Sequence, residues 1–592
     1  MIRPRRMFSP VGGEMGRVNG SLEKPALICV LVLVLTASNA AWGQPEPEKQ
    51  LAADSDATTK DTPRISPQPL APPVPARNAG TRRNAPIRNA GTRVAQQPQD
   101  TTADFWSHVP PLRRPDRVGY FVIAPDKPGY YSLLFLLLDE PSPTLPRLPY
   151  PPVSGDGYSF YDADYRYLEN PRFGEVDLFT LLKRIHPTDA WLLSFGGEER
   201  LRFMDENGGY QRITGQVNTD FWYRSRVYAD VWYRDWLRAY VEMSDARVFD
   251  TKFPLSTDLD RADFLNLFAD AKLFSLAQQP AYARIGRQEL YFGSQRLVSP
   301  SDWSNVRRTF QGVRAFWLGR KWTVDAFWVQ PVLIRPTQAD PPDHNQNFTG
   351  LWTRYRPYKG QAIEAYYLDL DNHNPGVAIG RDGIAGSYNV STLGARYSGD
   401  FRHFLWDFEG MYQLGAWSNQ IISAGAVTTG LGYQFANVPM NPQFWIYHDF
   451  ASGSQNPNGT IHGTFNQLFA WGHLYFGYLD LVGRQNIDDI SVQFGFWPTK
   501  WILTTFQNHV FHLVSARDAL YNASGVPIRS SPMGTAGTYV GDEIDITTNI
   551  HLDLHNDIFL GYSKLFAGAF IHRTAGPQTG PSLFYVTYSL KW

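Results

Sequence analysis

Apolar and polar positions alternate with a period of two from about residue 190 to the end of the 592-residue chain. The alternation is clearest over residues 542–554, where isoleucine and leucine side chains take one face and acidic side chains the other. Successive side chains of a β-strand point to opposite faces of its sheet, so each such segment has one apolar and one polar face. Residues 190–592 are therefore predicted to form one large β structure.

A soluble β-sandwich also alternates, so other features must decide whether the apolar face meets a core or lipid. The apolar faces are rich in aromatic residues, and the chain ends on Trp592. A final strand that ends on an aromatic residue is a signal that the barrel-assembly machinery of the outer membrane reads. These features favour a transmembrane barrel with apolar side chains facing lipid and polar ones lining a lumen. The side chains expected to face lipid include Phe404, Trp406, Ile544, Ile546, Tyr588 and Leu590.

The composition agrees with this prediction, since the chain has 49 glycines and 15% aromatic against 19% charged residues. Gly-rich turns and aromatic girdles at two membrane surfaces give such a balance, although a soluble β-propeller has a similar one. The net charge of −1 predicts no bulk attraction to nucleic acid. About 400 residues, at roughly 22 for each strand and its connection, predict about 16 to 18 strands.

The first 43 residues have the order of a secretory signal peptide. Basic residues precede an apolar run from Ala26 to Leu35, and small residues follow it, so cleavage is predicted between Ala40 and Gln44. The run is shorter than the ~20 residues that a spanning helix needs, which argues against a membrane anchor. Cys29 is the single cysteine and lies in this run. The mature chain is therefore expected to have neither disulfides nor thiolate metal sites.

Residues 44–103 are rich in Pro, Ala, Asn, Asp and Arg and nearly free of large apolar residues. Such a segment cannot bury enough surface to fold and is predicted to be disordered. Its repeated RNAGTR sequence is interpreted as part of a solvated spacer, with a basic tether to a periplasmic polymer as the alternative. Residues 104–189 contain short apolar stretches and are expected to lie in the periplasm or pack against the barrel mouth. A plug is possible, but nothing in the sequence requires one.

The stretch from Arg284 to Lys321 is unusually basic, with eight Arg or Lys residues against Glu289 and Asp302. Its Gly-Arg-Gln sequence at 286–288 returns at 483–485, and Trp-Ser-Asn-Val-Arg-Arg lies between the two. We expect the two Gly-Arg-Gln segments to place an arginine at matching positions on separate strands. The Trp-Ser-Asn-Val-Arg-Arg stretch is expected to fold into the lumen.

Here the sequence resembles the alginate-export porin family. The resemblance rests on GRQEL, GSQRLVSP and WSNVRRTFQGVR in the basic stretch, on FNQLFAWGHLYFGYLDLVGRQNI at 465–487, and on GDEIDI, GYSKLFAGAFI and YVTYSLKW near the C-terminus. It implies a monomeric all-β fold, a transmembrane antiparallel barrel of about 18 strands with an arginine-rich constriction. Members of the family pass an anionic uronic-acid polymer outward across the outer membrane, which is the expected location of this chain.

Arginine suits this task because its planar guanidinium pairs with a carboxylate through two hydrogen bonds and stays charged. A ring of arginines at a narrow point lowers the barrier for an anion to enter. Acidic lumen residues would hold the arginines in place. The alternative is that arginines and acids only brace the wall. The residues predicted to line the pore are Arg284, Arg287, Arg307, Arg308, Arg314, Arg484, Glu409, Glu543 and Asp545.

Other functions receive less support from the sequence. It contains no HExxH, Walker loop or GxSxG motif, so no catalytic, cofactor or metal site is predicted. His509 and His512 lack the acid partner and serine spacing of a phospholipase, and Asp369, Asp371 and Asn372 are interpreted as a hairpin turn and not a Ca²⁺ loop. A general porin for small anions or sugars remains an alternative. So does a structural outer-membrane protein that tethers periplasmic export or cell-wall components.

Overall fold

The computed structural model describes residues 117–146, 149, 158–169 and 177–592, all of which lie within one compact unit, Asp100–Trp592. The barrel strands are β2 (Trp191–Asn207), β3 (Val217–Tyr233), β4 (Leu237–Phe249), β5 (Asp260–Leu276), β6 (Gln279–Gln288), β7 (Phe310–Leu318), β8 (Trp322–Pro331), β9 (Gln346–Tyr355), β10 (Gln361–Asn372), β13 (Tyr388–Phe401), β14 (Phe404–Trp417), β15 (Gln420–Gln434), β16 (Gln443–Ala451), β18 (Ile487–Thr499), β19 (Ile502–His512), β22 (Tyr539–His551), β23 (Asn556–Ala567) and β24 (Ser582–Lys591).

The short elements are the strands β1 (Ile185–Thr188), β11 (Ala378–Ile379), β12 (Ala385–Gly386), β17 (Ile461–His462), β20 (Ala519–Tyr521) and β21 (Pro527–Ser530), the helices α3 (Leu133–Leu137) and α4 (Ala569–Arg573), and the 3₁₀ turns η1 (Phe160–Asp162), η2 (Arg166–Glu169), η3 (Thr180–Leu182) and η4 (Arg381–Gly383). Among the described residues, no helix is long and apolar enough to cross a membrane.

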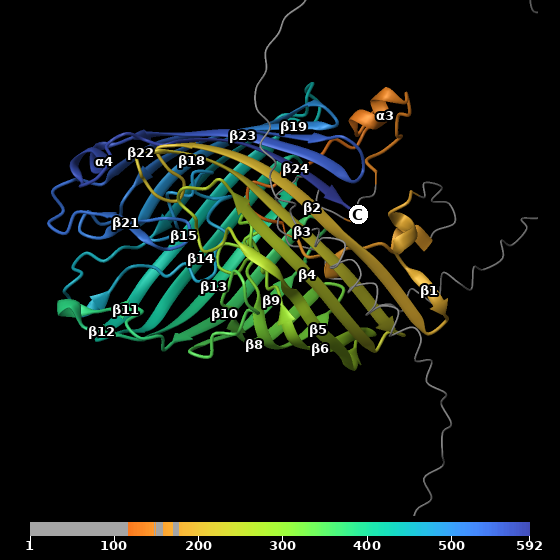
Figure 1. The fold of residues 1–592 in the computed structure, drawn as a ribbon, viewed down its shortest axis with the longest axis horizontal. Coiled ribbons are helices and arrows are strands. Elements are labelled where there is room, and N and C mark those ends of the chain that lie inside the picture. Colours follow the sequence, from red (N-terminus) through yellow and green to blue (C-terminus); the bar gives the residue numbers. More distant parts are fainter. Residues whose placement is uncertain (1–116, 147–148, 150–157, 170–176) are drawn as a thin grey trace, which may run out of the picture. The chain divides into compact units, whose positions relative to one another are not determined.

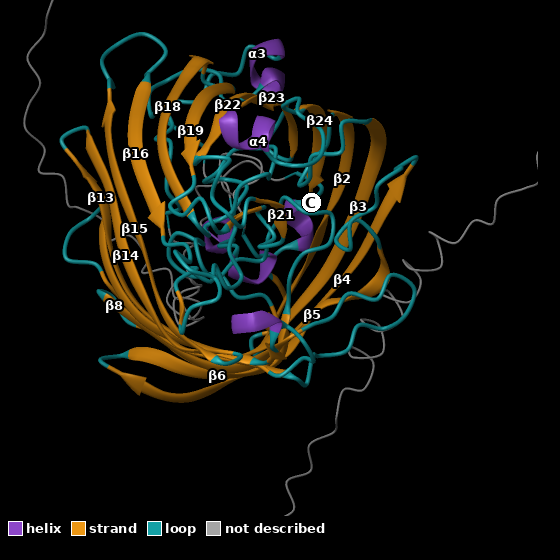
Figure 2. Cartoon of the chain, turned by 90° about the vertical axis from the view of Figure 1, so that its left-hand side faces the viewer, coloured by secondary structure: helices purple, strands orange, loops and turns teal. Residues whose placement is uncertain are grey.

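The sheet closes on itself. Each barrel strand pairs antiparallel with its neighbours in chain order, and β24 returns to pair with β2 over Glu198–Asn207. The result is a closed antiparallel barrel of 18 strands (Figures 1 and 2), which confirms the predicted fold class. Closure leaves no unpaired strand edge in the barrel wall, as a lipid environment demands.

The two faces of the wall differ as the alternation predicts. Along β14, Leu405, Asp407 and Glu409 are buried on the inner face, whereas Phe404 and Phe408 are 63% and 37% exposed on the outer face. All six side chains predicted to face lipid have the parity of the outer face in their strands. The inner face therefore carries the charges, and the outer face carries the apolar side chains.

The two ends of the barrel also differ. Short turns, such as residues 234–236 and 277–278, lie at the end that holds the start of β2 and the end of β24. Long connections lie at the other end, and those at 289–309 and 452–486 fold into the lumen (Figure 2). The two loops share a backbone β-bridge between Val298 and Phe469, and their apolar side chains belong to one core cluster. The loops thus fill much of the interior with their own core.

The N-terminal part of the described chain enters the lumen as well. Residues 117–123 contact the inner faces of β13, β14 and β16, and residues 158–165 contact those of β3–β6. The sequence favoured the periplasm or the barrel mouth for residues 104–189 and left a plug open; these two segments lie inside the barrel. The short apolar stretches form the helix α3 and the 3₁₀ turn η3. The predicted signal peptide and spacer at 1–103 lie outside the described residues.

Candidate functional site

Buried arginines and carboxylates alternate over the inner wall and the loops that fold against it. Their ion pairs are Arg224 with Glu198 and Asp302, Arg226 with Glu198 and Glu242, Arg238 with Asp230 and Asp270, Arg284 with Asp270, Arg296 with Asp407 and Glu409, Arg307 with Glu289 and Asp302, Arg314 with Asp325, Arg396 with Asp407 and Glu364, and Arg484 with Asp449. Charges removed from water need such partners, so this array keeps a charged lumen compatible with a folded wall.

The loop at 289–309 supplies two of these arginines, Arg296 and Arg307. Arg296 donates to Asp407 at 2.9 Å and to Glu409 at 3.0 Å, and its side chain is fully buried. Arg307 pairs with Glu289 and Asp302 and donates to the Tyr158 carbonyl at 2.9 Å. Burial alone would raise the pKa of Asp302, but the guanidiniums of Arg307 and Arg224 outweigh it and hold that pKa well below its usual range. Arg296 and Arg307 are therefore neutralised within the protein.

Arg308 differs from its neighbours, because none of its described contacts is with a carboxylate. Its guanidinium donates to the backbone carbonyls of Ser299, Phe469 and Ala470, with the shortest distance 2.6 Å to Phe469. Burial lowers the pKa of Arg308 to about 10, which leaves it charged at neutral pH. The side chain is only partly buried, so its charge remains available to an anion.

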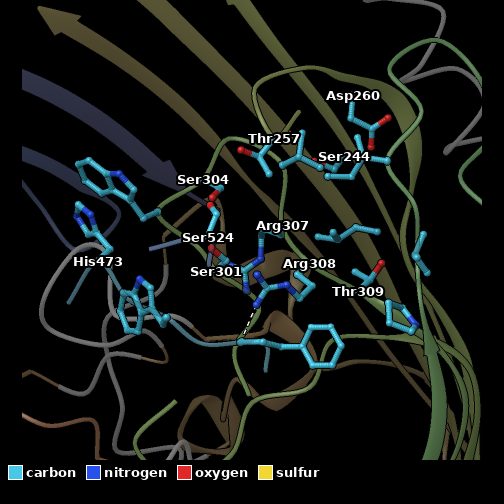
Figure 3. Close-up of a pocket in the computed structure, with 18 of the residues that line it drawn as sticks. Ser244, Thr257, Asp260, Ser301, Ser304, Arg307, Arg308, Thr309, His473 and Ser524 are labelled. Carbon is cyan, nitrogen blue, oxygen red and sulfur yellow. Dashed lines mark hydrogen bonds between the residues drawn. The ribbon is translucent and has the colours of Figure 1, made fainter. Parts of the chain in front are cut away.

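A cavity of about 170 Å³ lies beside Arg308, between the loops at the long-loop end (Figure 3). Arg307 and Arg308 lie near its centre, and Ser244, Thr257 and Asp260 lie on the far side from His473. The cavity is far larger than the ~10–15 Å³ that holds a single water molecule. Trp471 also lines the cavity, and its buried indole N–H has no acceptor among the described residues. The cavity thus offers a cation, hydrogen-bond donors and, opposite them, carboxylate and hydroxyl acceptors.

Most predicted pore arginines lie inside the barrel, but Arg287 does not. Arg284, Arg314 and Arg484 are buried and paired with Asp270, Asp325 and Asp449. Arg287 is opposite Leu267, which is 48% exposed on the outer face, and it bonds to Asp263 and to the Phe264 and Asp340 carbonyls. Its position at the end of β6 allows polar neighbours to satisfy it. Arg287 is therefore not a pore-lining residue.

The two Gly-Arg-Gln segments are not equivalent. Arg287 belongs to β6, whereas Arg484 precedes β18 in a loop folded into the lumen. The prediction of matching positions on two strands is wrong because it ignored that the second segment ends a long loop. The Trp-Ser-Asn-Val-Arg-Arg stretch does fold inward, with both Trp303 and Asn305 buried.

The three predicted lumen acids have different roles. Glu409 accepts from Arg296, Ser294 and Tyr366 and so holds an arginine, as predicted. Glu543 and Asp545 instead accept from the backbone amides of Leu479 at 2.9 Å and Tyr478 at 3.3 Å. No arginine pairs with these two among the described residues. They fasten a luminal loop to β22.

Several lumen residues were missed by the sequence prediction. Arg224 and Arg226 share the inner-facing parity of β3, and Glu198 and Asp407 have the same parity in β2 and β14. The alternation itself would have found them. The seating of Tyr158 and Tyr161 against the loop at 289–309 left no sequence signal, because it depends on contacts between residues more than 100 positions apart.

The remaining candidates occupy ordinary wall positions. His509 does have an acid partner, since Asp489 on the neighbouring strand lies 2.9 Å away, but Ser515 bonds instead to the Ser454 carbonyl. Asp369 and Asp371 lie within β10, which corrects the predicted hairpin turn. Among the described residues no group of three or more His, Cys, Asp or Glu side chains is arranged to hold a metal ion.

Residues 191–585 match the family model described as alginate export. The chain belongs to the alginate-export family. Together with the closed barrel, this membership shows an outer-membrane channel of the transporter type. No curated protein matches the sequence significantly.

The chain aligns with solved structures at low identity and with TM-scores below 0.5. OccK8 (OprE) of Pseudomonas aeruginosa aligns at 11% identity and a TM-score of 0.46, over 69% of this chain and 99% of that chain. OccAB2 of Acinetobacter baumannii aligns at 11% identity and a TM-score of 0.46, over 67% and 98%. The outer-membrane protein OprD of Pseudomonas aeruginosa aligns at 9% identity and a TM-score of 0.44, over 67% and 94%.

Proposed function

We propose that this member of the alginate-export family conducts an anionic saccharide, alginate-like in chemistry, through its arginine-lined lumen. The observation that carries the proposal is the state of Arg308, which has no carboxylate partner among the described residues although its neighbours Arg296 and Arg307 are fully paired. A uronate carboxylate would supply the missing partner through the two-pronged geometry that guanidinium favours.

The far side of the cavity favours a sugar acid over a simple anion. Asp260, Asp263 and Asp340 line it together with Ser244 and Thr257. Carboxylates repel an anion such as phosphate, but they accept hydrogen bonds from the hydroxyls of a sugar ring. A sugar acid with its carboxylate at Arg308 and its hydroxyls toward these residues matches both sides of the cavity.

Planar-bilayer recording with an oligouronate on one side tests this function. The wild-type channel is expected to be anion-selective and blocked by the oligouronate. The variant Arg308→Ala should weaken block about tenfold or more, because a hydrogen bond to a charged group contributes about 1.5–3 kcal/mol. Arg308→Lys should be intermediate, since lysine keeps the charge but lacks the planar fork.

The matched control is Arg402→Ala, which removes an exposed arginine from the turn between β13 and β14, outside the cavity lining, and should leave selectivity and block unchanged. Heat-modifiable migration on a gel checks that each variant forms a barrel. Anion selectivity without oligouronate block would indicate a general porin for small anions. A channel that stays silent in the wild-type form would favour a structural tether.

A further inference from the structure

The inner wall around Tyr447 at the short-turn end is covered by residues 117–123 of the same chain. Tyr120 packs on Tyr447 with ring centroids 4.2 Å apart, and Phe121 meets Trp445 edge-on at 5.0 Å. The wall at this place combines these aromatic rings with Arg296 and Asp407. We call this surface the Tyr447 wall. It consists of Arg396, Asp407, Trp445 and Tyr447 from the barrel strands and of Arg296 and Tyr475 from the luminal loops.

The wall holds the segment chiefly through the segment's backbone. Arg396 donates to the Arg117 carbonyl at 2.9 Å, and the Gly119 amide donates to the Tyr475 hydroxyl at 2.8 Å. The Tyr120 amide donates to the Tyr447 hydroxyl at 3.1 Å. These contacts recognise alternating donors and acceptors on an extended chain. Saccharide hydroxyls and carboxylates present the same groups, and the flat faces of sugar rings pack on aromatic side chains.

We propose that the Tyr447 wall is a saccharide-binding site for which residues 117–121 are the resident cover. The proposal rests on the proposed function for the chemical class of the ligand, an anionic saccharide. The wall and the Arg308 cavity are built from the same two luminal loops, because Arg296 and Arg308 belong to one loop and Tyr475 and Trp471 to another. A polymer that reaches the cavity from the short-turn end meets the covered wall first.

The segment 117–121 packs closely against the Tyr447 wall at Gly119, where there is no room for a side chain. A Cβ at Gly119 would lie 2.7 Å from an Arg296 guanidinium nitrogen, 2.8 Å from the Tyr475 ring and 2.9 Å from an Asp407 carboxylate oxygen. The Gly119 backbone is not in the left-handed region, so space and not backbone strain makes glycine necessary here. Arg296 and Asp407 are held by their buried ion pair, so a larger residue at position 119 is expected to lift the segment from the wall.

This seat gives a direct test with the full-length chain in planar bilayers. Gly119→Val should raise conductance and strengthen oligouronate block about tenfold, since a site occupied by its own cover most of the time shows a proportionally reduced affinity. Tyr120→Ala should act in the same direction, because it removes the stacking on Tyr447 and the bond to Ser491. The control Gly410→Val makes the same change on the outer face, where a Cβ meets nothing within 4 Å.

The outcomes separate this inference from the proposed function. Unchanged conductance and block in both Gly119→Val and Tyr120→Ala would overturn the inference. Raised conductance with block no stronger than in the wild type would also overturn it, since the wall would then not bind the saccharide. Absence of oligouronate block in every variant, including the wild type, would instead refute the proposed function.

Discussion

Replacing Asp407 by asparagine should destabilise the barrel more than any change to an exposed ion pair. Asp407 is fully buried and accepts from Arg396 at 2.7 Å, from Arg296 at 2.9 Å and from the Tyr447 hydroxyl at 3.3 Å. Asparagine has one acceptor oxygen, and its amide would direct donors at a guanidinium. Glu409 and Glu364 would then be left to balance both arginines.

The expected cost is about 3–5 kcal/mol, the usual penalty for removing one partner from a buried ion pair. It corresponds to a change of roughly a hundredfold or more in the unfolding equilibrium, at about 1.4 kcal/mol for each factor of ten. Urea unfolding of the purified barrel in lipid vesicles, followed by heat-modifiable migration, measures it. The neutral substitution also tests whether the charge itself stabilises the wall.

The control for this prediction is Asp488→Asn. Asp488 pairs with His448 at 2.7 Å, but the two side chains are 46% and 51% exposed. An exposed pair contributes about 0–1 kcal/mol, so this variant should unfold nearly as the wild type does. Equal small losses for Asp407→Asn and Asp488→Asn would refute the reasoning that the buried array depends on each of its charges.

Two further predictions concern the loops. Burial raises the pKa of Asp258 to about 7, and the nearby Asp220 adds to this, so the folded state holds a proton that the unfolded state loses near pH 4. Stability from this group is present below about pH 4 and is lost as the pH rises to about 7. Asp258→Asn should therefore flatten the dependence of the melting temperature on pH between pH 5 and 8. An unchanged pH dependence would contradict this origin. A Cβ at Gly477, which has φ +82°, would lie 2.2 Å from a Glu543 oxygen, whereas one at Gly376, with φ +70°, meets nothing. Gly477→Ala should therefore lower the free energy of unfolding more than Gly376→Ala, which adds only backbone strain of about 1–3 kcal/mol. Equal urea midpoints for the two variants would show that the luminal loop shifts to accommodate the added methyl group without loss of stability.

Alternation along the chain predicted the two faces of the wall, and together with the aromatic apolar faces, the C-terminal aromatic residue and the chain length it predicted a barrel of about 16 to 18 strands. Phe404 and Ile546 lie on the outer face and Glu409 and Asp545 on the inner face because strand parity is a local property of an extended backbone. Strand parity also places Arg224 and Arg226 on the inner face, although neither was among the predicted pore-lining residues.

Tertiary structure alone decided which charges are paired and which segments fill the lumen. Arg307 and Arg308 are neighbours in sequence, yet one is neutralised by Glu289 and Asp302 and the other meets only backbone carbonyls. Arg287 has the outer-face parity of β6, and the tertiary structure supplies Asp263 as its partner there. The seating of Gly119 against Asp407 joins residues 288 positions apart. Such contacts depend on how closure of the barrel brings distant strands and loops together, and no local pattern in the sequence encodes which residues meet.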